Sequence, residues 1–172
     1  MSERPESATE FEIIEVEAKP TIAVRVSLRM ADFDLGPVFA RWLPAVAERI
    51  GGASGQIGGP AFGRYHRFGP DGVDVEIGFV VAVAGEGLEP LASLPEGSIG
   101  RSELPGGWVA RTVHRGPYDG LPPVYDALHE WIHAQPGFDD GPGPWEEYLD
   151  APEPGADMGD VRTAVVWPLI ST

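Results

Sequence analysis

Hydrophobic and polar residues alternate with a period of two over several short stretches of this chain. The stretch 21–29 is the clearest: every second residue from Ile22 to Leu28 is apolar, whereas Arg25 and Arg29 mark a polar side. This period is typical of a β-strand with one buried face. The same pattern predicts strands at 11–19, 21–29, 61–68, 73–83, 98–104, 108–115, 144–149 and 161–170.

Two longer stretches carry apolar residues at helical spacing, which predicts amphipathic helices over 35–50 and 121–134. Pro37 suits a first helical turn, because its missing N–H has no partner there in any helix. Pro44 lies in the interior, where proline removes a hydrogen bond and clashes with the preceding turn, so we expect a kink or break. The glycine-rich segment 51–59 is expected to form a loop.

The sequence repeats itself at a fixed offset, since residues in the first half have similar counterparts 86 positions further on. Self-similarity of this kind indicates two copies of one structural unit. The equivalent pairs are Arg25 and Arg111, Arg29 and Arg115, Leu35 and Leu121, Pro37 and Pro123, Val38 and Val124, and Phe39 and Tyr125.

We therefore expect an α+β fold built from tandem duplicated β–β–α–β–β units with pseudo-twofold symmetry. The units would be 11–83 and 98–170, joined by a linker at 84–97. A cleft between related halves is a common place for a small ligand, so we expect a ligand cleft there. Residues 1–10 are expected to form a flexible arm, and 11–172 a single domain.

The charge of the chain narrows the classes of partner. Its 27 acidic and 12 basic residues give a net charge of −15. This balance argues against direct nucleic-acid binding, which needs clustered Lys and Arg, and against anionic membranes. It favours cationic ligands, although solubility alone is a sufficient reason for an acidic surface.

The chain has no cysteine, which excludes disulfides and thiolate chemistry. No apolar run has the length of a membrane span, and the polar N-terminus does not resemble a signal peptide, so we expect a cytoplasmic protein. Nucleophile-elbow, phosphate-loop and dinucleotide motifs are missing from the sequence, and we expect no cofactor.

Three segments, 104–110, 114–118 and 145–149, together with Leu128 and Trp131 between them, resemble the GyrI-like small-molecule-binding family. Its domain also serves as the effector-binding domain of AraC-type and MerR-type regulators. The resemblance extends over about residues 11–170. It implies two β–β–α–β–β halves whose sheets form a concave surface, with an aromatic pocket between them and one glutamate projecting into it.

That glutamate corresponds to Glu146. On a strand, Glu146 and Tyr148 point to one face, and Trp145 and Glu147 to the other. Glu147 stands where the family pattern has an apolar residue, which leaves open which carboxylate faces inward. A carboxylate among aromatic rings suits a flat cation. The alternative is an exposed carboxylate on an edge strand.

Further pocket candidates come from the repeat and from the resemblance. At a local offset of 83, Tyr65 corresponds to Tyr148 and Gly63 to Glu146, so a glycine leaves room beside the carboxylate. The resemblance implies pocket roles for Tyr118 and Trp131, whereas periodicity alone places them in the core.

Among the remaining tryptophans, Trp42 is expected in the core of the first helix. For Trp108 and Trp167, which lie on strands, the pattern does not decide which face each occupies.

Residues 129–133 read His-Glu-Trp-Ile-His, the letters of a zinc-protease motif. That motif needs two buried histidines above a cleft and a third ligand downstream. Here Leu128 and Ile132 define the buried face, which turns His129 and His133 towards solvent. We therefore predict no metal site at this pair.

The expected function is that of a stand-alone protein that binds aromatic, cationic drugs or metabolites, rather than an enzyme. One alternative follows from the resemblance, since some GyrI-like proteins hydrolyse strained cyclopropyl DNA-alkylating compounds. Glu146 would then be the general base, and Tyr148 or Tyr118 would donate to the leaving carbonyl. The other alternative is an acidic protein-interaction module that imitates DNA and occupies an enzyme such as a gyrase.

Overall fold

The computed structural model describes residues 10–150 and 157–172. The expected arm, apart from Glu10, and residues 151–156 of the last loop lie outside the described residues. The helices are α1 (Leu35–Gly52) and α2 (Leu121–His133). The strands are β1 (Glu12–Val16), β2 (Lys19–Leu28), β3 (Gln56–Gly69), β4 (Gly72–Val83), β5 (Ile99–Leu104), β6 (Gly107–Arg115), β7 (Phe138–Asp140), β8 (Trp145–Tyr148) and β9 (Arg162–Ser171).

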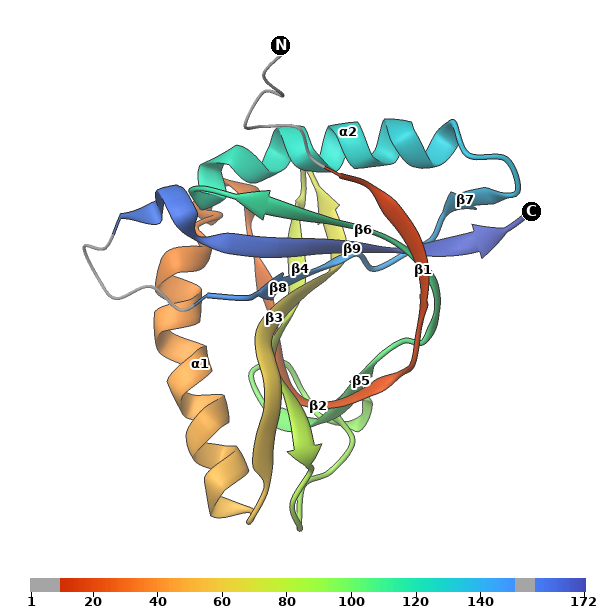
Figure 1. Ribbon diagram of the computed structural model, residues 1–172. Helices are drawn as coiled ribbons and strands as arrows, with labels where there is room; N and C mark the ends of the chain where they lie inside the picture. The colour runs from red at the N-terminus through yellow and green to blue at the C-terminus, as the bar shows by residue number, and fades with distance from the viewer. Residues whose placement is uncertain (1–9, 151–156) are drawn as a thin grey trace.

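Across the described ranges, the strands form one antiparallel arrangement in the order β1-β6-β9-β8-β3-β4-β2-β5, with β7 added beside β9. The expected mixed helix and strand fold is therefore confirmed. The first strand of each predicted half pairs with the second strand of the other half, because β1 lies on β6 and β5 lies on β2. Figure 1 shows these strands curving round one side of the molecule, while β8 lies in the middle. One continuous sheet thus replaces the two sheets that we expected.

Hydrophobic residues are buried on both faces of this sheet. The helices cover one face, where Ile50 of α1 and Leu128 of α2 are fully or almost fully buried. On the other face, the curled ends of the sheet enclose a second cluster that includes Phe62 and Trp145. Residues 21–24 of β2 are buried on both sides, so our expectation of a polar face is wrong over this part. The reason is that Ala23 packs into the second cluster.

Helix α1 begins at a side-chain cap, since Asp34 accepts a hydrogen bond from the Gly36 amide at 3.0 Å. The helix then continues to Gly52, so the expectation of a break at Pro44 is wrong. Pro44 lies on the exposed side of the helix, where water can hydrogen-bond to the carbonyl that proline leaves unpaired.

Strand β3 begins five residues earlier than predicted, inside the segment that we expected to be a loop. The pairing with β4 shifts between Ile57 and Ala61, which marks a bulge. A Cβ atom added to Gly58 would lie 2.5 Å from the backbone nitrogen of Ala82. Glycine at this point therefore permits a close approach of two strands, rather than a loop.

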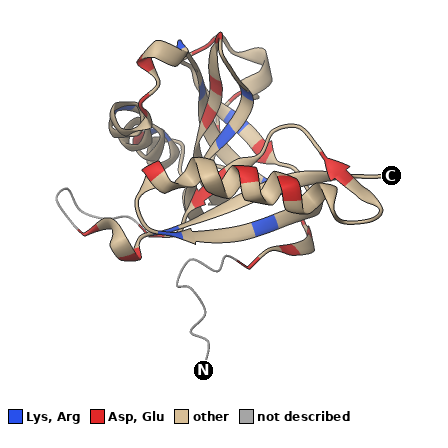
Figure 2. Cartoon of the chain, turned by 90° about the horizontal axis from the view of Figure 1, so that it is seen from above, with Lys and Arg blue, Asp and Glu red and all other residues tan. Residues whose placement is uncertain are grey.

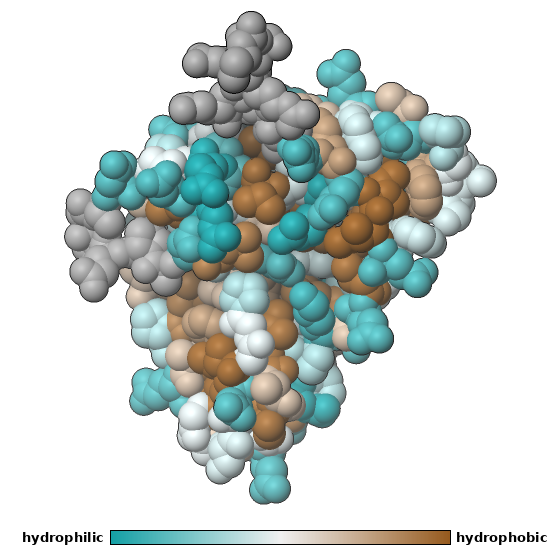
Figure 3. Space-filling view, viewed as in Figure 1, coloured by the Kyte–Doolittle hydropathy of each residue, from teal (hydrophilic) through white to brown (hydrophobic). Residues whose placement is uncertain are grey.

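Charged and apolar positions are mixed on the parts of the described chain that Figures 2 and 3 show. Acidic positions occur on helices, strands and loops alike, with basic positions scattered among them (Figure 2). Hydrophobic residues reach the surface in patches that hydrophilic residues interrupt (Figure 3). Among the described residues, neither helix is long and apolar enough to cross a membrane.

Candidate functional site

The candidate site is built around Glu146, which lies in β8 at the centre of the sheet. Its direct neighbours across the sheet are Gly63 of β3 and Val165 of β9. The side chain points to the face that the two helices cover, and the residue is only 3% exposed. A carboxylate is thus buried on a central strand of the sheet, rather than at an edge.

Tyrosine hydroxyls surround this carboxylate. Tyr125 of α2 donates a hydrogen bond to Glu146 Oε2 at 2.8 Å, and Tyr148 donates to Oε1 at 2.9 Å. Tyr65 of β3 also lies close to this carboxylate, and burial together with Glu146 raises the pKa of its hydroxyl. Within the described ranges, no Lys or Arg forms an ion pair with Glu146; its hydrogen bonds come from tyrosine hydroxyls, and His114 is near enough to oppose the rise of its pKa.

Burial raises the pKa of Glu146 above its ordinary value, while the hydrogen bonds from the tyrosines oppose this effect. Burial and the neighbouring carboxylate also raise the pKa of Tyr125 and of Tyr148. The tyrosines therefore stay protonated at every physiological pH and remain donors. This leaves Glu146 as the group whose charge can respond to a ligand.

Aromatic rings close the space around the carboxylate. Phe39 of α1 lies against Tyr148 with ring centres 5.0 Å apart, and Tyr118, in the short helix before α2, lies 5.8 Å from Tyr148. A Cβ atom on Gly63 would approach the Tyr148 hydroxyl oxygen to 3.0 Å and the Phe39 ring to 3.7 Å. The expected room beside the carboxylate is therefore filled by these side chains.

The other two residues of the predicted motif occupy the opposite face of the sheet. The indole nitrogen of Trp145 donates to Glu147 Oε1 at 3.2 Å, and the Lys19 ammonium lies 3.9 Å from the same oxygen. Both residues line a cavity of about 180 Å³ on that face. Glu147 thus has a cationic neighbour, unlike Glu146.

The structure brings Tyr65, Tyr118 and Tyr148 to Glu146, but not Trp131. The ring of Trp131 packs on Phe11 instead, with ring centres 5.5 Å apart. The reason is the helical period: Trp131 lies six residues after Tyr125 and faces away from the carboxylate.

The other tryptophans lie in different surroundings. Trp42 packs partly buried against the core beneath α1, as expected. Trp108 is 44% exposed, and Trp167 lies against Tyr125 with ring centres 6.0 Å apart.

Sequence reasoning missed Tyr125 and Phe39 as members of this group. The repeat pairs Phe39 with Tyr125, and this equivalence could have indicated that both belong to the site. Their place on the helices, beside strongly apolar neighbours, instead suggested the core.

An antiparallel sheet covered by two helices on one face, with a tyrosine-bound carboxylate at its centre, defines a class of small mixed α/β domain. Residues 9–170 match the GyrI-like small molecule binding domain, and the chain belongs to this family. The resemblance expected from the sequence is thereby confirmed. A search of curated proteins finds no match.

Solved structures share the fold at low sequence identity. The EcmrR C-terminal domain has a TM-score of 0.77 and 20% identity, over 96% of this chain and 99% of that domain. The EcmrR chain in a complex with DNA has a TM-score of 0.76 and 20% identity; 95% of this chain aligns, and it spans 58% of that EcmrR chain. SAV2435 bound to tetraphenylphosphonium has a TM-score of 0.60 and 12% identity, over 94% of each chain.

Proposed function

We propose that this protein binds aromatic, cationic small molecules at Glu146. One observation carries the proposal: Glu146 is a buried carboxylate whose hydrogen bonds come from tyrosines and which forms no ion pair with a Lys or Arg among the described residues. Burying a charge without a counter-ion is unfavourable, and a cationic ligand would supply the missing charge. The surrounding rings offer it stacking and cation–π contacts.

Entry of a ligand requires a local rearrangement, because Phe39 and Tyr118 cover the carboxylate. Tyr118 is 38% exposed, and its ring contacts Tyr148. The aromatic residues around Glu146 therefore reach the surface at Tyr118. We infer that the ligand's rings take the places of the Phe39 and Tyr118 side chains. Stacking against the ligand would then replace the ring–ring packing that opening breaks.

We also infer that the site arose from a duplicated unit. The offsets read from the sequence pair Phe39 with Tyr125, and Tyr65 with Tyr148. All four rings belong to the group around Glu146, and Gly63, the counterpart of Glu146, lies directly across the sheet from it. One copy would supply the charge and the other the glycine across from it, against which Tyr148 and Phe39 pack, with the pseudo-twofold axis running between β3 and β8.

The test compares a cationic ligand with a neutral ligand of similar shape, namely tetraphenylphosphonium and triphenylphosphine oxide. Glu146→Gln keeps the volume but removes the charge, so we expect binding of the cation to weaken by about 1.5–3 kcal/mol, or roughly ten- to a hundredfold. The neutral compound should lose little affinity. Isothermal titration calorimetry measures both.

Glu147→Gln is the matched control, since this side chain points to the opposite face and has Lys19 beside it. It should leave binding of both compounds unchanged. Equal losses in the two variants, or equal losses for the two compounds in Glu146→Gln, would contradict the proposal.

The raised pKa of Glu146 supports a second candidate, a hydrolase. One neighbour of similar fold is described as a hydrolase from Listeria innocua, with a TM-score of 0.60 and 12% identity. A carboxylate with a raised pKa is a better general base at neutral pH: Glu146 would take a proton from a water whose oxygen attacks a cyclopropane carbon. The ring C–C bond would break, and Tyr148 would protonate the carbonyl oxygen that receives the electron pair. Turnover of a strained cyclopropyl electrophile that disappears in Glu146→Gln, while binding persists, would favour this function.

A further inference from the structure

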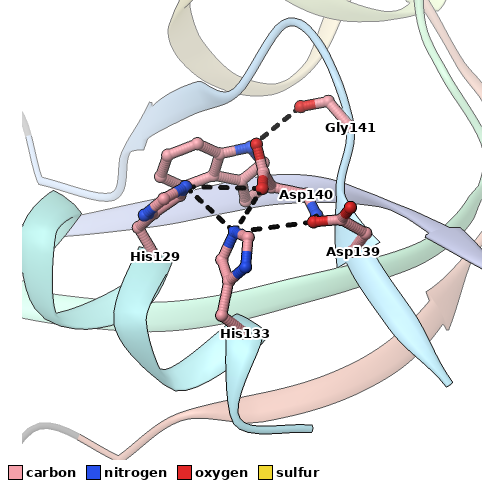
Figure 4. Close-up of polar contacts among 6 residues, drawn as sticks. His129, His133, Asp139, Asp140 and Gly141 are labelled. Atoms are coloured by element: carbon pink, nitrogen blue, oxygen red, sulfur yellow. Dashed lines mark hydrogen bonds and ion pairs between the residues drawn. The ribbon is translucent and has the colours of Figure 1, made fainter. Parts of the chain in front are cut away.

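Away from Glu146, the end of α2 and the short strand β7 bring two imidazoles and a carboxylate together. His129 and His133 stand one helical turn apart, and their Nε2 atoms are 3.2 Å apart. Asp140 Oδ1 lies 3.3 Å from His129 Nε2 and 2.6 Å from His133 Nε2. Figure 4 shows the three side chains pointing at a common centre, with Asp139 beside them.

The spacing of these donor atoms suits a divalent transition metal. Bonds of about 2.0–2.1 Å in a tetrahedral arrangement place neighbouring ligand atoms about 3.3 Å apart. Two of the three separations already have this value within about 0.1 Å, and a turn of the Asp140 side chain opens the third. Two imidazoles and one carboxylate are also ligand types that zinc prefers.

Hydrogen bonds alone do not account for all three short contacts. If each neutral imidazole carries its proton on Nε2, both can donate to Asp140 Oδ1, but the 3.2 Å contact between the two nitrogens is then no hydrogen bond, because neither nitrogen has a free lone pair. A metal ion in the centre would accept a lone pair from all three atoms at once.

The backbone holds the three ligands in place before any ion binds. The i, i+4 spacing on α2 fixes the two histidines on one helix face. Asp140 pairs with Leu169 of β9, and the following residue, Gly141, donates its amide to the Pro168 carbonyl at 2.7 Å. The Gly141 carbonyl accepts a hydrogen bond from the Trp167 indole at 2.9 Å. Ligands that are held in position in this way favour metal affinity.

We propose that His129, His133 and Asp140 form a binding site for Zn²⁺ or a similar divalent transition metal, with its fourth position open to solvent. The sequence led us to expect no metal here, because the buried face of the helix turns His129 and His133 towards solvent. The third ligand, Asp140, comes from β7, a strand that the sequence pattern did not predict.

The site is not that of a zinc protease, despite the letter match. Glu130, which would be the general base of that motif, is exposed and does not belong to this group of ligands. A metal here joins the end of α2 to β7.

The test uses the tag-free, full-length protein after dialysis against a chelator, titrated with zinc chloride in a calorimeter. We expect one zinc per chain and an increase in the melting temperature on zinc addition. Removing a residue that only supports a ligand costs about 10–100-fold in metal affinity, so His129→Gln, His133→Gln and Asp140→Asn should each cost at least about a hundredfold. Circular dichroism shows whether each variant keeps its fold.

Glu130→Gln is the matched control on the same helix and should bind zinc like the unmodified protein. The proposal is overturned if zinc does not bind in a saturable one-to-one manner. It is also overturned if folded Asp140→Asn or a folded histidine variant binds as tightly as the control.

Discussion

At Glu146, burial raises the pKa and the tyrosine hydrogen bonds lower it. The net shift is upward, which shows that the effect of burial is the larger one. The sign of the effect on stability follows. Above the ordinary glutamate pKa of 4.5, the unfolded chain has released its proton while the folded chain still holds it. The contribution of Glu146 to the free energy of unfolding therefore falls as the pH rises from 4.5 through the raised value.

We predict that Glu146→Gln stabilises the protein at neutral pH, by on the order of 1 kcal/mol, because it removes this cost. The advantage over the unmodified protein should shrink as the pH falls to about 4, where both states of Glu146 are protonated. Urea denaturation at about pH 4 and about pH 8 measures the difference. A variant less stable than the unmodified protein at the higher pH would show that hydrogen bonding outweighs burial.

The period of two in a strand was enough to predict that Glu146 and Tyr148 share a face. It could not show that Gly63 lies directly across from Glu146, because register depends on how distant strands pair. Tyr125 lies on a helix far along the chain, and its contact with Glu146 depends on how α2 packs. The family resemblance therefore pointed to Glu146 and the local pattern placed Tyr148 on its face, while tertiary packing determined which other side chains surround it.

At the scale of helices and strands, the intrinsic preferences of single residues predicted the elements less well than the surroundings of those residues explain them. Proline in α1 and glycines in β3 both predicted interruptions, yet the helix and the strand run through them. Pro44 is tolerated because it faces solvent, and Gly58 because it meets a backbone at close range. In both cases, the surroundings of the residue decided the outcome.

We predict that Pro44→Ala stabilises the protein by about 1–3 kcal/mol, because alanine restores the helical hydrogen bond to Ala40 and proline is the poorest residue in a helix interior. The side chain is exposed, so the substitution leaves the core intact. The denaturant midpoint measures the change.

Pro37→Ala is the control in the same helix. Pro37 lies in the first turn, where its amide has no helical partner, so the midpoint should hardly move. Equal stabilisation by both substitutions would contradict this account.

At the scale of the whole molecule, the two halves depend on each other for their edge strands. Removal of β1 would expose β6, and removal of β5 would expose β2. If one half unfolds, the sheet of the other half therefore loses its edge strand.

We predict that the halves unfold in one transition. In differential scanning calorimetry, the calorimetric and van't Hoff enthalpies should agree. Two separate transitions would show that the exchanged strands do not couple the halves.

The exchange of β1 and β5 has the form of a domain-swapped dimer built within one polypeptide. The segment between β4 and β5 makes the encounter of the halves intramolecular, and such a tether corresponds to an effective concentration on the order of millimolar. Stability should therefore not depend on how dilute the protein is. A cut in this segment would make assembly of the two fragments a second-order process. Dilution would then dissociate them and leave β6 without β1 and β2 without β5.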